Sequence, residues 1–330
     1  MRKAVCAAMT LALLLAGKRT AYGIDSTAGT ATGSFLQMGG SARSLAMGGT
    51  GAALVSDPSA IWTNPGQLAG LTTPEFSFTH GQYVEDVSIN QMVFAGPLPL
   101  GVVCAALTMM EIGAIDSYDA SGAAAGTVEP KDTGLTAGYA VEAGKAGVGG
   151  SFTFIDSQLA SDAKATAIAV DLGGRYEVLP ALTLTLAAQH LGPSMKFGVK
   201  ASRLPMVIRG GVSGDLLSGR LRLAGDVVKP ADSAAVLLAG AEVSRDFSGD
   251  VSLSLRGGWK SLAPQGGNGG VSAGGGLRWR PKVPLGKDAD MESAFGIKDS
   301  LTLSGIRVDY AWTPLGELGT AHWLSFSLAF

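Results

Sequence analysis

Segments in which apolar and polar residues alternate follow one another from Pro74 to the end of the chain. In one of the clearest, Val251, Leu253 and Leu255 alternate with two serines and an arginine. A period of two places all the apolar side chains on one face of a β-strand. Most segments approach the ~9–11 residues that a tilted membrane-spanning strand needs. Fourteen strands are predicted, over residues 75–83, 87–96, 101–111, 133–143, 147–157, 164–178, 181–191, 204–213, 219–229, 235–246, 250–259, 270–280, 300–312 and 320–330.

The even number of strands predicts an all-β fold, an antiparallel transmembrane β-barrel of about 14 strands. The sheet must close because lipid offers no hydrogen-bond partner to the edge of an open sheet. Composition agrees: 46% of the residues are hydrophobic and only 16% are charged, against about 25% charged residues in typical soluble domains. In a barrel the apolar faces contact lipid and the polar faces line the lumen. The alternative is a soluble β-sandwich, which would bury the same apolar faces in a core.

Tryptophans near the ends of predicted strands favour the membrane interpretation. Trp259, Trp279, Trp312 and Trp323 all occupy such positions. Aromatic girdles at the two membrane interfaces explain this placement, whereas ordinary core packing is the alternative. Near Gly305 the alternation changes phase, and one extra residue in a β-bulge would produce that change.

The connections between the predicted strands fall into a short set and a longer set that alternate along the chain. Short periplasmic turns and longer outer loops are typical of outer-membrane barrels. The connection over residues 281–299 breaks the rule, because it is long on the side of the short turns.

The N-terminus has the pattern of a secretory signal peptide over residues 1–23. Arg2 and Lys3 precede an apolar run from Ala4 to Gly17, and a small-x-small cleavage pattern ends at Gly23. A transmembrane anchor is the alternative, but it needs about 20 apolar residues. The formal net charge is -2 and becomes more negative once this basic leader is removed, which argues against a nucleic-acid partner. Cleavage also leaves a single cysteine, so an internal disulfide is excluded.

Residues 24–73 are predicted to form an N-terminal plug or hatch segment within a barrel of residues 74–330. Asp57-Pro58 and Asn64-Pro65 are each typical of a capped helix start, and they predict two short helices over 58–63 and 65–69. Met47-Gly48-Gly49 allows close approach of the backbone to another element, because glycine has no Cβ atom. We expect this plug near the periplasmic end of the barrel, with Trp62 and Leu68 packed on the wall.

Motifs that suggest catalysis or a metal are weak. Gly270-Val-Ser-Ala-Gly274 matches the nucleophile elbow of hydrolases, but the following residues continue as a strand instead of starting a helix. The three histidines, His80, His190 and His322, lack metal-ligand spacing. A phosphate-binding loop follows a strand and is followed by a lysine, and Gly48-Gly-Thr-Gly51 has neither. We therefore predict a protein that is not an enzyme and has no metal or cofactor.

Charged residues on the polar phases of the strands are candidate lumen groups. Four arginines and three aspartates share this property, and buried charges need such pairing. One interpretation is a ladder of ion pairs that fills and stiffens the barrel, and the other is a site for an anionic ligand or a partner's carboxylate. The set comprises Arg209, Arg222, Arg256, Arg278, Asp171, Asp226 and Asp309.

The final residues form an alternating strand that ends in phenylalanine. Trp323, Phe326 and Phe330 resemble the C-terminal insertion signal of bacterial outer-membrane barrels. With the signal peptide, this pattern predicts the bacterial outer membrane as the location. The expected partners are outer-membrane lipid and the barrel-insertion machinery.

Both ends of the chain resemble the PorV/PorQ family, a branch of the FadL-like outer-membrane barrels. At the N-terminal end, the residues that carry the resemblance are Phe35-Leu36, Leu45-Ala-Met-Gly-Gly49, Asp57 with Ser59-Ala60, and Trp62-Thr-Asn-Pro65. The sequence departs from the family at Gly66, where alanine is common. At the C-terminal end they are Val308-Asp-Tyr310, Pro314 to Thr320 and Phe330. The resemblance implies a fourteen-stranded barrel with an N-terminal segment in its lumen.

Within that superfamily the resemblance implies two functions. PorV-like members serve type IX secretion of proteins, and FadL-like relatives transport hydrophobic small molecules. We favour protein secretion or surface delivery here, with secreted proteins or other secretion components as partners. The small, polar loops over 117–132 and 261–269 suit protein contact better than capture of an oily molecule. FadL-like transport is the alternative.

Overall fold

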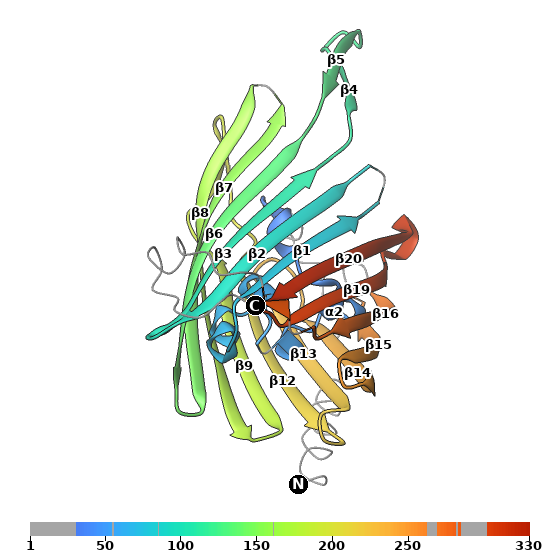
Figure 1. Ribbon diagram of the computed structural model, residues 1–330. Coiled ribbons are helices and arrows are strands. Elements are labelled where there is room, and N and C mark those ends of the chain that lie inside the picture. The colour runs from blue at the N-terminus through green and yellow to red at the C-terminus, as the bar shows by residue number, and fades with distance from the viewer. Residues whose placement is uncertain are drawn as a thin grey trace.

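The computed structural model describes residues 31–54, 56–84, 86–160, 162–262, 269–281, 283–284 and 302–330. Fourteen antiparallel strands form a closed barrel, each paired with its neighbours in chain order (Figure 1). This confirms the predicted fold class. The barrel strands are β1 (Glu75–Gln82), β2 (Ser88–Leu98), β3 (Gly101–Glu111), β6 (Lys131–Ala143), β7 (Ala146–Ala160), β8 (Ala163–Leu179), β9 (Leu182–Leu191), β12 (Val207–Leu216), β13 (Leu221–Pro230), β14 (Val236–Ser248), β15 (Val251–Lys260), β16 (Gly270–Trp279), β19 (Gly305–Pro314) and β20 (Thr320–Ala329). In the described part of the chain, no helix has the length and hydropathy that crossing a membrane requires.

The first and last strands close the barrel. β1 pairs with β20 over eight residues, from Glu75 opposite Ala329 to Gln82 opposite His322. Beyond the strand, the Phe330 nitrogen donates a hydrogen bond of 2.9 Å to the Pro74 carbonyl. The C-terminal residue therefore lies at the seam of the barrel.

The two rims of the barrel differ. We call the rim where β1 begins and β20 ends the proximal rim, and the opposite one the distal rim. The proximal turns are short at 99–100, 144–145, 180–181, 217–220 and 249–250. The distal connections include two hairpins, β4 (Ile115–Tyr118) with β5 (Ala124–Val128) and β10 (Met195–Phe197) with β11 (Lys200–Ser202). The β4–β5 hairpin projects well beyond the wall (Figure 1).

The long proximal connection carries a third, two-residue pair, β17 (Val283–Pro284) with β18 (Thr302–Leu303). β19 starts only at Gly305 and pairs regularly with β20 from that residue on. The predicted strand over 300–312 is therefore confirmed from Gly305 on as β19, but its predicted start is too early and the predicted bulge near Gly305 is wrong. Leu303 belongs to a different sheet from Ile306, so the phase change marks a boundary between two elements.

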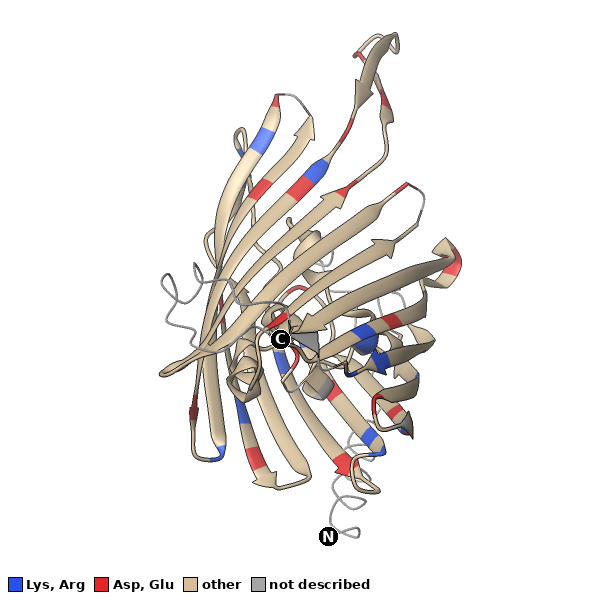
Figure 2. Ribbon diagram, in the orientation of Figure 1, with Lys and Arg blue, Asp and Glu red and all other residues tan. Residues whose placement is uncertain are grey.

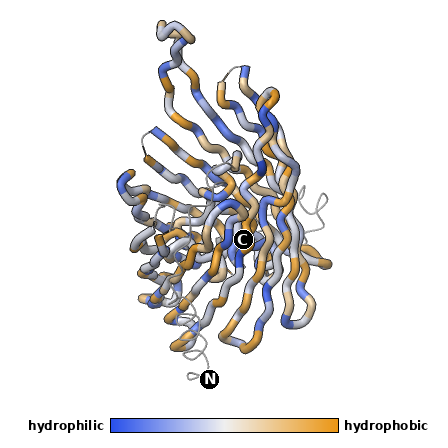
Figure 3. The backbone as a smooth tube through the Cα atoms, turned by 180° about the vertical axis from the view of Figure 1, so that it is seen from behind, coloured by the Kyte–Doolittle hydropathy of each residue, from blue (hydrophilic) through white to orange (hydrophobic). Residues whose placement is uncertain are grey.

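The exterior of the barrel is apolar along the strands, and Figure 3 shows the alternation of hydrophobic and hydrophilic residues. Leu186 and Leu255 point outward and are 64% and 74% exposed. Trp259 and Trp279 also face outward, each 46% exposed. Trp323 is different: it lies on the inner face of β20 and is only 3% exposed. Its predicted place in an exterior girdle is wrong, because it falls on the phase of the inward-facing serines of β20.

Inside the barrel lies a segment of short helices, coloured blue in Figure 1. We call residues 31–71 the plug. The helices are η1 (Ser34–Gln37), α2 (Ala42–Ala46), η2 (Ala52–Leu54), η3 (Pro58–Trp62) and η4 (Pro65–Gly70). The Asp57 side chain accepts from the Ser59 nitrogen at the start of η3, and Asn64 accepts from the Gly66 nitrogen at the start of η4. Because each cap is followed by proline, helix initiation is encoded locally. The predicted signal peptide, residues 1–23, lies outside the described residues.

Candidate functional site

The plug touches the wall where the wall strands carry glycine. The Gly48 nitrogen, in a left-handed turn after α2, donates to Ser272 Oγ at 3.0 Å, and that hydroxyl donates to the Ala46 carbonyl at 3.1 Å. A Cβ atom on Gly258 of β15 would lie 1.9 Å from the Gly48 nitrogen. Ser272 lies within strand β16 and not at a strand-to-helix turn. Its environment is therefore that of a plug contact and not of a nucleophile elbow.

A second contact lies on the opposite side of the lumen. The Asn64 amide of the plug donates to the carbonyls of Gly174 at 3.0 Å and Leu186 at 3.3 Å. A Cβ atom on Gly66 would lie 2.5 Å from the Gly173 carbonyl oxygen. Position 66 therefore has no room for a side chain, because the backbone of β8 occupies that space.

A third contact holds the chain between these two. Arg209 donates through Nη1 to the Gly49 carbonyl at 3.1 Å and to Asp226 at 2.8 Å. The Asp226 carboxylate also accepts from the Gly51 nitrogen at 2.7 Å. This wall ion pair therefore binds both a carbonyl and an amide of the glycine-rich plug turn.

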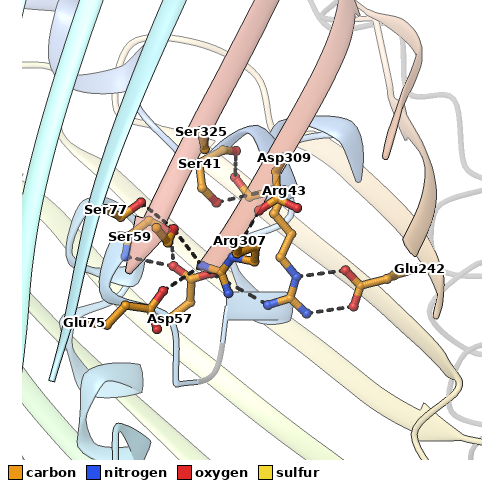
Figure 4. Close-up of polar contacts among 12 residues, drawn as sticks. Ser41, Arg43, Asp57, Ser59, Glu75, Ser77, Glu242, Arg307, Asp309 and Ser325 are labelled. Atoms are coloured by element: carbon orange, nitrogen blue, oxygen red, sulfur yellow. Dashed lines mark hydrogen bonds and ion pairs between the residues drawn. The ribbon is translucent and has the colours of Figure 1, made fainter. Parts of the chain in front are cut away.

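A network of buried charges joins the plug to four wall strands, β1, β14, β15 and β19 (Figure 4). Arg43 of α2 binds Glu242 through two hydrogen bonds, of 2.8 and 2.9 Å. Glu242 also accepts from Arg256 at 2.6 Å, and Arg256 donates to Asp309 at 2.7 Å. A two-pronged contact between guanidinium and carboxylate is among the strongest polar contacts in proteins. These residues lie on β14, β15 and β19, so one plug arginine is tied into three strands.

The network continues across the seam through Arg307. Arg307 Nη2 lies 2.9 Å from Glu75 of β1 and 3.1 Å from Asp57 of the plug. Asp57, 1% exposed, is also 3.7 Å from the guanidinium of Arg43. It therefore caps η3 and pairs with two arginines. We call Arg43, Asp57, Glu75, Glu242, Arg256, Arg307 and Asp309 the seam network.

The predicted lumen charges divide among several sites. Arg209 pairs with Asp226, and Arg256 pairs with Asp309. Arg222 pairs with Asp215 near the proximal rim. Figure 2 shows that charged residues are sparse along β1, β2 and β20. The two other members, outside these pairs, are Arg278, which lies opposite Arg307 in the β16–β19 register, and Asp171, which accepts from the His190 nitrogen and the Ser151 hydroxyl.

Sequence reasoning missed Arg43, Arg307, Glu242 and Glu75. Arg43 lies in a segment without strand periodicity, and nothing local indicates its partner. The phase change at Gly305 obscured the face on which Arg307 lies. Its spacing of two from Asp309 is the signal that could have placed both residues on one face of a strand.

The ionisation of Asp57 has a testable consequence. Burial raises the pKa of its carboxyl, but Arg307, Arg43 and Ser59 together outweigh burial and hold the pKa below the ordinary 3.8. A carboxyl whose pKa is lowered in the folded state stabilises the fold at pH values above its ordinary pKa. That stabilisation is lost as the pH falls through the lowered pKa. We therefore expect the difference in urea-unfolding free energy between wild type and Asp57→Asn to stay constant from about pH 7 to about pH 4. A difference that shrinks within that interval would contradict the pairing.

Between the plug and the distal rim lies a cavity of about 270 Å³, which we call the main cavity. Its floor is formed by plug residues that include Gly48, Gly49 and Trp62, and its walls by distal strand ends. Most lining side chains are apolar or aromatic, and the described lining contains no carboxylate. Its basic groups are Arg209, Lys260 and His190. The cavity is therefore apolar with a basic edge.

Comparison with known proteins gives similarity at the level of fold. Neither a family model nor a curated protein matches the chain. Among solved structures, the Pseudomonas putida toluene transporter TodX superposes with a TM-score of 0.57 and 13% identity, covering 88% of this chain and 97% of that one. The monoaromatic hydrocarbon channel CymD superposes with a TM-score of 0.54 and 11% identity, covering 88% of this chain and 97% of that one. A Pseudomonas aeruginosa FadL homologue gives 0.54 and 10%, with 88% and 98% covered.

These neighbours are a transporter, a channel and a FadL homologue, and none is described as an enzyme. They support the FadL-like part of the resemblance and give no support to the narrower PorV/PorQ assignment. The chain thus has the fold of FadL-like barrels.

Proposed function

We propose that this protein is a non-enzymatic outer-membrane channel for a small, mainly apolar molecule. The observation that supports the proposal is the main cavity, which lies inside a closed barrel and above a plug. Its volume, about 270 Å³, falls just below the roughly 300–1,000 Å³ of pockets for drug-sized ligands. A cavity of this size favours the FadL-like alternative over the protein-secretion function that the sequence favoured.

The basic edge narrows the class of ligand. Arg209 already binds Asp226, whereas no described carboxylate pairs with Lys260 in the cavity lining. An apolar molecule that carries a carboxylate or a similar acceptor would supply the missing partner. The toluene and monoaromatic channels among the structural neighbours suggest an aromatic body for such a molecule.

The proposed surroundings follow from the exterior. Outward leucines and tryptophans on many strands suit lipid, and the short proximal turns suit the periplasmic side. On this orientation the main cavity opens toward the outside of the cell, and the plug separates it from the periplasm. Outer-membrane lipid and the barrel-insertion machinery remain the proposed partners.

The test uses full-length protein in nanodiscs and equilibrium dialysis with benzoate and its neutral analogue benzamide. We expect Lys260→Gln to weaken benzoate binding about fivefold, because an exposed ion pair contributes up to ~1 kcal/mol. Benzamide binding should be unchanged. An equal loss of affinity for both probes would show that Lys260 does not pair with the carboxylate. If benzoate, benzamide and toluene all fail to bind to the wild type, the channel proposal is wrong.

A deletion strain distinguishes transport from secretion. The channel proposal expects slower growth on aromatic acids or hydrocarbons as the carbon source and an unchanged surface proteome. Missing surface proteins with normal growth would favour secretion.

A further inference from the structure

A second cavity lies beside the main cavity, on the side of β2, β3 and β6 to β8. Its volume is only about 10 Å³, roughly the space for one water molecule. Residues with hydroxyl, amide and carboxylate side chains line its far walls, among them Thr108, Thr136, Gln91 and Asp171. We call it the side cavity. It has the wrong size for a ligand but the right position to extend the main cavity.

Three residues line both cavities and therefore lie between them: Leu36 of η1, Trp62 at the end of η3 and His190 of β9. We call these three residues the partition. His190 is fixed by its ring nitrogen Nδ1, 3.1 Å from the Pro205 carbonyl. Trp62 is fixed through its backbone, because its carbonyl accepts from Gln189 at 2.8 Å.

The indole of Trp62 is the part of the partition that polar contacts do not hold. Its Nε1 is buried and has no hydrogen-bond partner among the described residues. Removal of the indole would therefore break no described hydrogen bond, while the contact of the Trp62 carbonyl would remain. We therefore treat the indole as a packing group between the main cavity and the side cavity.

We propose that Trp62 determines the maximum length of the ligand by closing the main cavity against the side cavity. This inference rests on the proposed function, because it assumes that the main cavity holds the ligand. Without the indole, the two cavities join, and a chain too long for the main cavity continues toward the threonines of β3 and β6. In the wild type, such a chain meets Trp62.

The test measures dissociation constants of a series of 4-n-alkylbenzoates for full-length protein in nanodiscs. In the wild type, affinity should rise roughly fourfold for each buried methylene and then fall beyond a limiting chain length. In Trp62→Ala the rise should continue for about two more methylenes, so that ligands beyond the wild-type limit bind roughly tenfold tighter or better than to wild type.

Two variants control for general loosening. Trp62→Phe keeps an aromatic partition and should keep the wild-type limit. Trp323 lines the main cavity but not the side cavity. Trp323→Ala therefore removes an indole without joining the two cavities, and should leave the limiting chain length unchanged. Heat-modifiable migration on gels checks that each variant folds.

The outcomes separate the two proposals. If no alkylbenzoate binds to wild type, the proposed function fails. If wild type binds with a length limit that Trp62→Ala leaves unchanged, the proposed function stands and the inference is wrong. An equal shift in Trp62→Ala and Trp323→Ala would also overturn it, because the shift would then reflect volume alone.

Discussion

Gly258→Ala is expected to open the barrel to ions and to raise its conductance in planar bilayers several-fold over wild type. The added methyl group would lie 1.9 Å from the Gly48 nitrogen and 2.2 Å from the Met47 carbonyl carbon. Both atoms belong to backbone, so a rotamer change cannot relieve the clash. The plug must withdraw from the wall, and it loses the hydrogen bond between Gly48 and Ser272 as it does so.

The control lies one residue away. A Cβ atom on Gly257 meets no atom within 4 Å, and Gly257 faces outward on the same strand. Gly257→Ala should therefore conduct like wild type. The conductance of a variant that lacks residues 35–70 gives the upper limit expected for a barrel without its plug. If Gly258→Ala conducts like wild type, the contact between Met47–Gly48 and β15 does not close the pore.

Arg307→Ala should produce the largest loss of stability among single variants of the seam network. Its guanidinium is 3.1 Å from Asp57, 2.9 Å from Glu75 and 3.1 Å from Asp309, and these carboxylates are almost fully buried. Removal of one member of a buried ion pair costs about 3–5 kcal/mol, because the remaining charge stays buried without a partner. We expect a loss of that size in urea unfolding from lipid vesicles.

The matched control is Arg280→Ala. Arg280 lies 3.7 Å from Asp246, and both side chains are largely exposed. Exposed ion pairs contribute about 0–1 kcal/mol, so this variant should unfold close to wild type. Equal losses for Arg280→Ala and Arg307→Ala would show that the seam network contributes no more than a surface pair.

Local chemistry was enough to predict the barrel strands and the helix starts of the plug. Alternation along 251–259 gives β15, because each strand must present one face to lipid and one to the lumen. Asp57 and Asn64 begin η3 and η4, because an N-cap and a following proline act within one turn. The prediction failed at Gly305, where two neighbouring segments with strand character belong to different sheets.

The sequence by itself determined the number of strands, the closed barrel and the residues that face each side of most strands. Only the tertiary structure decided which of those residues meet. Arg43 and Glu242 are 199 positions apart, and no periodicity relates a helix of the plug to a strand of the wall. The inward position of Trp323, the fit of Gly48 against Gly258 and the partition at Trp62 likewise depend on how the plug is placed in the lumen. Alternation is a property of neighbouring residues, whereas a cavity and an ion pair are properties of distant residues brought together by closure of the barrel around the plug.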